Sequence, residues 1–238
     1  MRNYRFFLSH IQEPVFQITD KNILHKMNKV LRLNKDSQEE LEFFDSSSFV
    51  YKVKINELTS SKAVLTVIEK SKSKRELDFF VKFYIPIIKP ENYFWMLRKL
   101  TELGVAEFQP VHFERSQKKY LETIQKQKEK ALITIQEAVE QCSGAVLPRY
   151  NEIKTFSELQ FSSEIPNKYF AYEELSLKNS SLDIPKMTDT LIMVGPEGGL
   201  TSKEVKDLGE MHFTAVGLGS RLLKAETAAI VLFSRIYS

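Results

Sequence analysis

Two short glycine-bearing loops near the end of the chain have residue types and spacing suited to binding a small polar ligand. Residues 191–199 read LIMVGPEGG, and residues 216–228 read VGLGSRLLKAETA. Each segment starts as an apolar run typical of a strand and ends where a helix is expected to begin. Backbone N–H groups at such a strand–loop–helix junction can face a ligand, so the two loops predict one cofactor held between them.

Neither loop matches the common phosphate-binding motifs. The chain contains no GxxxxGK(S/T) sequence and no GxGxxG sequence. An isolated Gly-Gly pair is often only a tight turn, which is the alternative interpretation of residues 195–199. Here Pro196 stiffens the loop, while Gly198 and Gly199 allow another group to approach the backbone closely. This combination suits packing against a flat ring such as adenine.

The first seventy or so residues predict a small β-barrel with one helix. Short strands are expected at residues 6–8, 14–18, 42–44, 49–55 and 63–68, separated by clusters of Asp, Asn and Ser. Between residues 20 and 33 the apolar residues recur at helical spacing, and Asp20 is a suitable N-cap. The polar, charged stretch at 71–75 suits a domain linker.

After this linker the pattern alternates between strand and helix. Strands are expected at 77–88, 105–111, 169–172, 190–194 and 213–216, and helices at 90–104, 118–142, 201–211 and 225–237. Thr201 and Glu204 have the spacing of a capping box. Because the strands are nearly continuous in apolar residues, we expect a mostly parallel sheet covered by helices on both faces.

Composition and charge exclude several classes of protein. No apolar stretch approaches the roughly 20 residues that cross a bilayer. Cys142 is the single cysteine and the four histidines are far apart, so neither a disulfide nor a metal site is expected. Lys and Arg outnumber Asp and Glu by 15 to 11 in residues 1–83 and by 10 to 8 in 84–150, but the ratio is 9 to 12 in 151–238. We therefore expect a cytoplasmic protein without a membrane or metal partner, in which mainly the N-terminal part binds a polyanion.

Together, the sequences GPEGG at 195–199 and LGSRLLKAETA at 218–228 resemble the SPOUT superfamily of methyltransferases, whose C-terminal trefoil knot binds S-adenosylmethionine. The closer likeness is to the RsmE-type enzymes, which methylate N3 of a uridine in 16S ribosomal RNA. HKMNKVLR at 25–32, KLTELGV at 99–105 and EAVEQ at 137–141 are similar to further segments of that family, in the same order. The resemblance implies a SPOUT-type α/β trefoil-knot domain with a parallel sheet over residues 71–238, preceded by a PUA-like β-barrel RNA-binding domain over residues 1–70.

Two positions differ from the family's usual pattern. The family carries an arginine a few residues after Gln141, where this chain has CSGA with Gly144 nearest. Lys224 stands where the family carries arginine, which keeps the positive charge but loses the planar fork of a guanidinium. The difference at Gly144 favours a second hypothesis, a non-catalytic RNA-binding or ribosome-assembly factor with a retained SPOUT fold. Methylation of transfer RNA is a third, which fits the N-terminal segments less well.

The resemblance also implies an S-adenosylmethionine pocket built by both loops. Backbone groups would read the edge of the adenine, and Leu222 and Leu223 would cover its face. The expected cofactor-binding residues are Gly195, Pro196, Glu197, Gly198 and Gly199 from the first loop and Leu218, Gly219, Ser220, Leu222 and Leu223 from the second.

Methyl transfer from a sulfonium to N3 of uracil requires removal of the N3 proton or stabilisation of charge on the flanking carbonyl oxygens. Lys224 and Arg221 could supply the positive charge, and Glu226 or Glu197 could accept the proton. The structural alternatives are that Glu226 stabilises the start of the last helix through its dipole and that Glu197 satisfies donors of its own turn.

The expected contacts to ribosomal RNA or the small subunit are Arg5, His25, Arg32 and Arg115, with Arg5 and Arg32 on phosphates. His25 is interpreted as a structural or RNA-contacting side chain rather than as a base. The family resemblance further implies a homodimer in which the active site is completed across the interface.

Overall fold

The computed structural model describes residues 3–37, 39–177 and 184–237 and divides the chain into two compact units. The N-terminal unit comprises residues 1–76 and 139–147, and the C-terminal unit comprises residues 77–138 and 148–238. The boundary thus lies at residue 76 rather than 70, since strand β5 (Ala63–Lys72) continues into the expected linker. The segment 139–147, expected in the second domain, belongs to the first unit.

The N-terminal unit contains a five-stranded mixed sheet with the strand order β1-β3-β4-β5-β2. Its strands are β1 (Asn3–Phe7), β2 (Val15–Ile18), β3 (Glu40–Phe44), β4 (Phe49–Leu58) and β5. β1 pairs with β3 in parallel, whereas the other neighbours are antiparallel. Each of the five short strands expected in this part of the sequence is present, with bounds shifted by a few residues.

The core of this unit explains why the sheet curls into the expected barrel-like form. The rings of Phe6 and Phe43 stack with centroids 5.2 Å apart, and Phe16 meets Phe43 edge-on at 5.5 Å. Phe6 lies on β1 and Phe16 on β2, which are opposite edges in the strand order. Because both edge strands reach the ring of Phe43, the sheet bends around one core.

The expected helix at residues 20–33 consists of two parts. Asp20 caps α1 (Lys21–His25) by accepting from the N–H groups of Asn22 and Ile23, both at 2.9 Å, as predicted. The chain then continues as the π-helical segment η1 (Lys26–Val30), which ends before Arg32 at φ 55°. Within η1 the wider ring is closed by the bond from the Leu31 N–H to the Lys26 carbonyl at 2.9 Å.

Segment 139–147 joins the N-terminal unit through packing and polar contacts. Val139 and Ala145 are buried against Phe44 and Val50. The carboxylate of Glu140 accepts from the Phe7 N–H at 3.1 Å and pairs with the Lys26 ammonium at 2.6 Å. This part of the chain therefore completes a core that the first 76 residues leave open.

The C-terminal unit is built on a seven-stranded parallel sheet with the order β12-β10-β11-β6-β7-β8, β9 also pairing with β7. Its strands are β6 (Val81–Pro86), β7 (Glu107–His112), β8 (Arg149–Tyr150), β9 (Lys154–Thr155), β10 (Asn167–Ala171), β11 (Thr190–Met193) and β12 (Thr214–Val216). Its helices are α2 (Pro90–Glu102), α3 (Lys118–Lys126), α4 (Lys128–Cys142), the 3₁₀ turn η2 (Phe156–Glu158), α5 (Glu173–Leu177), α6 (Ser202–Glu210) and α7 (Ala225–Tyr237), the last four residues of α4 falling in the N-terminal unit. The parallel α/β architecture predicted from the sequence is confirmed.

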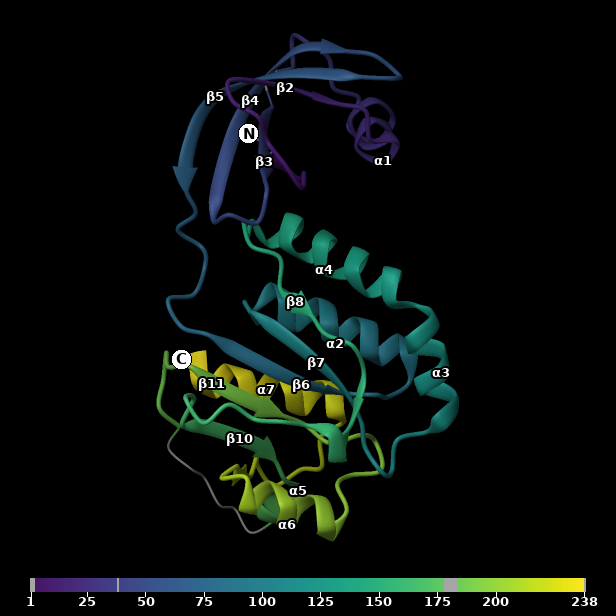
Figure 1. The fold of residues 1–238 in the computed structure, drawn as a ribbon, viewed down its shortest axis with the longest axis vertical. Coiled ribbons are helices and arrows are strands. Elements are labelled where there is room, and N and C mark those ends of the chain that lie inside the picture. Colours follow the sequence, from purple (N-terminus) through teal and green to yellow (C-terminus); the bar gives the residue numbers. More distant parts are fainter. Residues whose placement is uncertain (1–2, 38, 178–183, 238) are drawn as a thin grey trace. The chain divides into compact units, whose positions relative to one another are not determined.

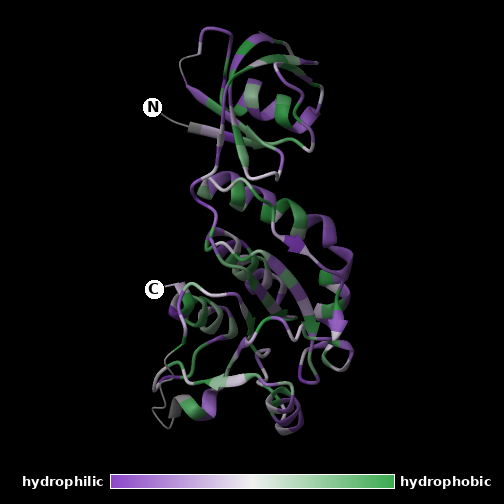
Figure 2. Ribbon diagram, turned by 60° about the vertical axis from the view of Figure 1, so that its left-hand side comes forward, coloured by the Kyte–Doolittle hydropathy of each residue, from purple (hydrophilic) through white to green (hydrophobic). Residues whose placement is uncertain are grey.

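Helices cover this sheet because its strands are apolar on both faces. Leu191 and Met193 of β11 pack in the same cluster as Leu208 of α6, whereas the alternate residue Ile192 points to the opposite face. Helices α2 and α7 lie side by side along the sheet, and α7 contacts β10 and β11 (Figure 1). In Figure 2, hydrophobic and hydrophilic colours alternate along the strands and helices of both units.

One expectation for this unit was wrong, and four short elements were missed. The single helix expected at 118–142 is broken at Gln127, whose N–H bonds to the Ile124 carbonyl at 3.0 Å in a tight final turn of α3. The short elements β8, β9, η2 and α5 were not expected, because two to five residues carry too little periodicity to be recognised.

Candidate functional site

A pocket of about 610 Å³ lies where β10, β11 and β12 end in the C-terminal unit. Its lining residues are Asn92, Ala171, Tyr172, Glu173, Val194, Gly195, Pro196, Glu197, Gly198, Gly199, Leu200, Leu218, Arg221, Leu222, Leu223, Lys224, Ala225, Glu226 and Ala228. The carboxyl ends of parallel strands are the usual place for a ligand, because the loops that follow neighbouring strands converge there. Both glycine-bearing loops recognised in the sequence meet in this pocket.

The first loop, residues 195–200 (the glycine loop), is a tight turn. The Gly199 N–H donates to the Pro196 carbonyl at 2.9 Å, and Gly199 has φ +71°. A Cβ atom added at Gly195 would lie 3.0 Å from Cγ of Leu200. The glycines therefore allow the turn to close on itself, with Leu200 folded back under its start.

Glu204 ties the end of the glycine loop to the turn after β7. Only 4% of Glu204 is exposed. Its Oε2 accepts from the Thr201 N–H at 2.7 Å and from the Thr201 hydroxyl at 3.1 Å, and the Thr201 hydroxyl accepts in turn from the Glu204 N–H. This is the predicted capping box. The other oxygen, Oε1, accepts from the Glu114 N–H at 3.0 Å.

Arg115, for which an RNA contact is expected from the sequence, holds the glycine loop in the structure. Its Nη1 donates to the carbonyl oxygens of Gly198 at 3.1 Å and Leu200 at 3.2 Å. A Cβ at Gly198 would lie 3.0 Å from Cβ and 3.3 Å from the carbonyl oxygen of Arg115. The close approach predicted for Gly198 is thus made by the protein's own chain, and its bare backbone is required for packing.

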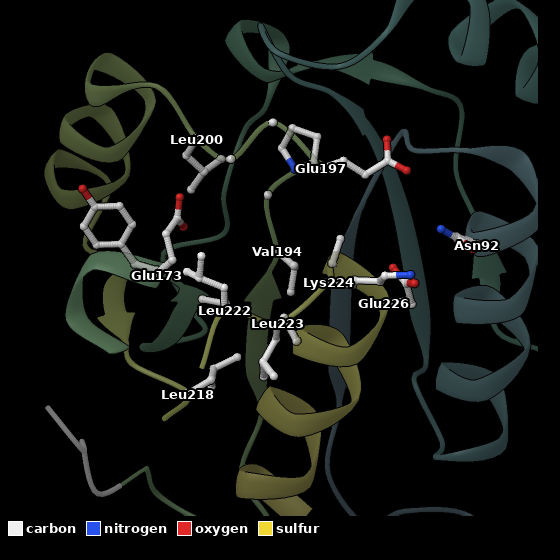
Figure 3. Close-up of a pocket in the computed structure, with 18 of the residues that line it drawn as sticks. Asn92, Glu173, Val194, Glu197, Leu200, Leu218, Leu222, Leu223, Lys224 and Glu226 are labelled. Carbon is white, nitrogen blue, oxygen red and sulfur yellow. The ribbon is translucent and has the colours of Figure 1, made fainter. Parts of the chain in front are cut away.

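The second loop, residues 217–224, provides an apolar wall. Arg235 of α7 anchors it by donating from Nη1 to the Gly217 carbonyl at 2.9 Å. Leu218, Leu222 and Leu223 line the pocket from this loop (Figure 3), and Leu222 is 71% exposed. Gly219 and Ser220 were expected to bind the cofactor but are not among the lining residues.

All three residues expected to be catalytic line the pocket. Arg221 and Lys224 are exposed, while Oε2 of Glu226 is buried and has no hydrogen-bond partner within the described ranges. A buried carboxylate oxygen without a donor is costly, so this atom is prepared to accept a proton or a hydrogen bond from a ligand. Glu197, the other candidate base, accepts from the Lys89 N–H at 3.3 Å, at the start of α2.

The sequence reasoning missed eight lining residues: Val194, Leu200, Ala225 and Ala228, which adjoin the two loops, and Asn92, Ala171, Tyr172 and Glu173, which come from other segments. Asn92 comes from α2 and points toward the side of the pocket occupied by Glu226 (Figure 3). Ala171, Tyr172 and Glu173 follow β10, and burial together with the Glu174 carboxylate raises the pKa of Tyr172 above its ordinary value. The strand expected at 169–172 could have indicated residues 171–173, because a parallel strand beside the glycine loops ends at the same edge of the sheet.

The remaining RNA candidates lie in the N-terminal unit and differ in exposure. Arg5 and Glu42 form an ion pair in which each side chain is 8% exposed, with Nε 2.9 Å from Oε2. Arg5 also donates to the carbonyls of Ser143 and Gly144. This guanidinium makes several internal contacts, and the phosphate contact expected for it stays a prediction. His25 and Arg32 are exposed.

Within the described ranges, no group of three or more His, Cys, Asp or Glu side chains is arranged to hold a metal ion. No helix of the described chain has both the length and the apolar character needed to span a membrane.

Comparison with known proteins identifies the family. The RNA methyltransferase domain family matches residues 75–237. Ribosomal RNA small subunit methyltransferase E of Bacillus subtilis is 32% identical over 94% of this chain and 90% of its own length, and that of Mesomycoplasma hyopneumoniae is 25% identical over 98% of both chains.

The crystal structure of ribosomal RNA small subunit methyltransferase E from Neisseria gonorrhoeae, bound to S-adenosyl methionine, superposes with a TM-score of 0.86 over 98% of this chain and 96% of that one, at 24% identity. This likeness confirms the SPOUT-type fold with its preceding barrel-like domain. The chain belongs to the RNA methyltransferase family, within the group of ribosomal RNA small subunit methyltransferases E.

Proposed function

We propose that this protein transfers the methyl group of S-adenosylmethionine to N3 of a uridine in 16S ribosomal RNA. The observation that carries the proposal is the buried Oε2 of Glu226, which has no hydrogen-bond partner among the described residues and lies in a pocket bounded by both glycine-bearing loops. The similarity to ribosomal RNA small subunit methyltransferases supports the substrate class, and the S-adenosyl methionine bound to the Neisseria protein supports the methyl donor.

The pocket suits an adenosyl group in size and chemistry. Its volume of about 610 Å³ lies within the range of small-molecule sites. Val194, Leu200, Leu218, Leu222 and Leu223 offer apolar surface for a flat ring, and the glycine loop offers backbone groups for its edge. Residues 195–199 with Leu218, Leu222 and Leu223 would therefore hold the cofactor, whereas Gly219 and Ser220 shape the loop.

When bound, S-adenosylmethionine supplies a methyl group on a positively charged sulfur. Glu226 accepts the N3 proton of the uracil, so that the N3 electron pair forms the new N–C bond as the S–C bond breaks. Lys224 and Arg221 stabilise the negative charge on the flanking carbonyl oxygens, because both are exposed cations on the rim of the same pocket. Holding nucleophile and methyl carbon in line is the remaining requirement.

The partners follow from the same proposal. His25 and Arg32, both exposed on the N-terminal unit, contact ribosomal RNA or the small subunit. A ribosomal substrate places the protein in the cytoplasm. The active protein is a homodimer, an assembly that light scattering coupled to size-exclusion chromatography tests directly.

The deciding experiment combines genetics with enzyme kinetics. Mass analysis of 16S ribosomal RNA from a deletion strain is expected to show one missing N3-methyluridine, restored by the wild-type chain. Glu226→Gln is expected to lower kcat by about 10²–10⁴-fold while cofactor binding persists. Glu210→Gln is the matched control, since that carboxylate is exposed on α6, pairs with Lys206 and does not line the pocket. Cofactor binding without any missing methyl mark would instead support a ribosome-assembly factor.

A further inference from the structure

We propose that Arg115 is a positioning residue for the cofactor: it sets the peptide planes of the glycine loop from behind, without touching the ligand. The inference rests on the proposed function, since it concerns the pocket assigned to S-adenosylmethionine. Arg115 is not among the residues that line that pocket, but both of its acceptors, Gly198 and Leu200, are.

The contacts between the turn after β7 and the glycine loop run in both directions. Arg115 reaches into the loop and donates to two carbonyls, while Glu204 reaches back and accepts from the Glu114 N–H at 3.0 Å. The turn itself is closed by the Ser116 N–H donating to the Phe113 carbonyl at 3.0 Å. Two neighbouring residues, Glu114 and Arg115, therefore connect the carboxyl end of β7 to the loop after β11.

These contacts define two peptide planes of the loop. In a trans peptide the C=O of one residue and the N–H of the next point in opposite directions. In the peptide between 198 and 199, the carbonyl binds Arg115 and the N–H binds the Pro196 carbonyl. In the peptide between 200 and 201, the carbonyl binds Arg115 and the N–H binds Glu204.

Both ends of these two peptides are thus held by the protein, and the peptide between 199 and 200 lies between them. The directions of the Gly199 carbonyl and the Leu200 N–H follow from the two held planes. Loss of Arg115 releases the carbonyl end of both planes at once, so the ligand would have to order the loop on binding and the affinity would fall.

The geometry at Gly198 supports the same role. A Cβ at this position would press on both the Cβ and the backbone carbonyl of Arg115, at 3.0 and 3.3 Å. The loop and the turn are packed backbone to backbone here, so a shift of one moves the other. The guanidinium is otherwise exposed, and an RNA phosphate is the competing partner that the test must separate.

The test measures binding of S-adenosylhomocysteine to the full chain by calorimetry without RNA, using wild type, Arg115→Ala, Arg115→Lys and Arg98→Ala. Arg115→Ala is expected to raise Kd about tenfold, because two charge-assisted hydrogen bonds are lost at an exposed position. Arg115→Lys, which keeps the positive charge and one donor nitrogen in place of Nη1, is expected to recover part of that loss. Arg98→Ala is the control, since Arg98 is exposed and its carboxylate partner is 3.9 Å away.

Each outcome has one meaning. If the wild type binds no S-adenosylhomocysteine, the proposed function fails. If the wild type binds and Arg115→Ala binds equally well, the positioning role is wrong. If Arg115→Ala leaves cofactor affinity intact and weakens only RNA binding, measured separately by fluorescence anisotropy, Arg115 is an RNA contact, as expected from the sequence.

Two further readouts separate positioning from a general loss of structure. Amide hydrogen exchange at Gly199 is expected to accelerate about tenfold in Arg115→Ala, while exchange in α7 stays unchanged. KM for the cofactor is expected to rise with kcat within about twofold, because bound substrate restores the loop. An unchanged amide at Gly199, or a loss confined to kcat, would overturn the proposal. If Arg115→Ala does not fold, Arg115→Lys carries the same comparisons.

Discussion

The carboxylate of Glu173 occupies the space that a side chain at position 199 would need. A Cβ at Gly199 would lie 2.8 Å from Oε1 of Glu173 and 3.8 Å from Nη1 of Arg115. Gly199 also has φ +71°, which favours glycine over every other residue. Both charged groups converge on this glycine from segments far apart in the sequence.

Gly199→Ala is therefore expected to raise the Kd for S-adenosylhomocysteine about tenfold or more, because the methyl group displaces Glu173 and the turn resists a Cβ. Calorimetry measures the change. Gly209→Ala is the matched control, because a Cβ at Gly209 meets nothing within 4 Å. Since Gly209 lies within α6, alanine is expected to stabilise the protein slightly. Equal affinity of both variants would contradict the steric explanation.

Arg5→Ala is expected to destabilise the N-terminal unit by about 3–5 kcal/mol, because it leaves the buried carboxylate of Glu42 without its partner. Urea unfolding followed by circular dichroism measures this loss. Lys52→Ala removes the exposed pair with Glu69 and is expected to change stability far less than Arg5→Ala does. A double variant, Arg5→Met with Glu42→Leu, is expected to lose less than Arg5→Ala alone. If Arg5→Ala has normal stability but weaker RNA binding, Arg5 contacts RNA, as predicted from the sequence.

Arg32→Ala is expected to weaken the binding of RNA whatever its base sequence, since one phosphate contact is lost. The slope of log affinity against log salt is expected to fall by about 1 for the same reason. Fluorescence anisotropy at several salt concentrations measures the slope. Lys206→Ala, an exposed lysine of α6 paired with Glu210, provides the comparison. An identical slope in wild type and Arg32→Ala would remove Arg32 from the interface.

The tyrosine pair in the C-terminal unit makes stability depend on alkaline pH. Tyr93 and Tyr150 share a hydrogen bond of 2.8 Å between their hydroxyls. Burial raises the pKa of Tyr150 to about 12 and that of Tyr93 well above its ordinary value. Because the folded state holds both phenols neutral, their contribution is complete below pH 10 and is lost as the pH rises from 10 toward 12.

Tyr150→Phe is therefore expected to flatten the fall in unfolding free energy over this range, by at most about 1.4 kcal/mol per pH unit. Denaturant unfolding at a series of pH values measures it. The variant loses one hydrogen bond at neutral pH, which is expected to cost about 1 kcal/mol. Parallel pH curves for variant and wild type would show that Tyr150 ionises equally in both states.

Local features of the site were predictable from the sequence because they depend on near neighbours in the chain. Thr201 and Glu204 are three residues apart and form their capping box through their own backbone groups. Asp20 caps α1 for the same reason. The two glycine-bearing loops and the leucines of the second loop were also recognisable, because turn preferences and apolar patterns depend on residues that are close in the sequence.

The tertiary structure alone decided what each charged side chain meets. Arg115 looked like an RNA contact until the parallel sheet brought the end of β7 against the loop after β11. Arg5 found Glu42 and the carbonyls near Gly144, because residues 139–147 return to the N-terminal unit. The partner of a long charged side chain is whichever group lies near it in space. Strand order and the return of residues 139–147 to the first unit determine these distances, and neither leaves a local pattern in the sequence.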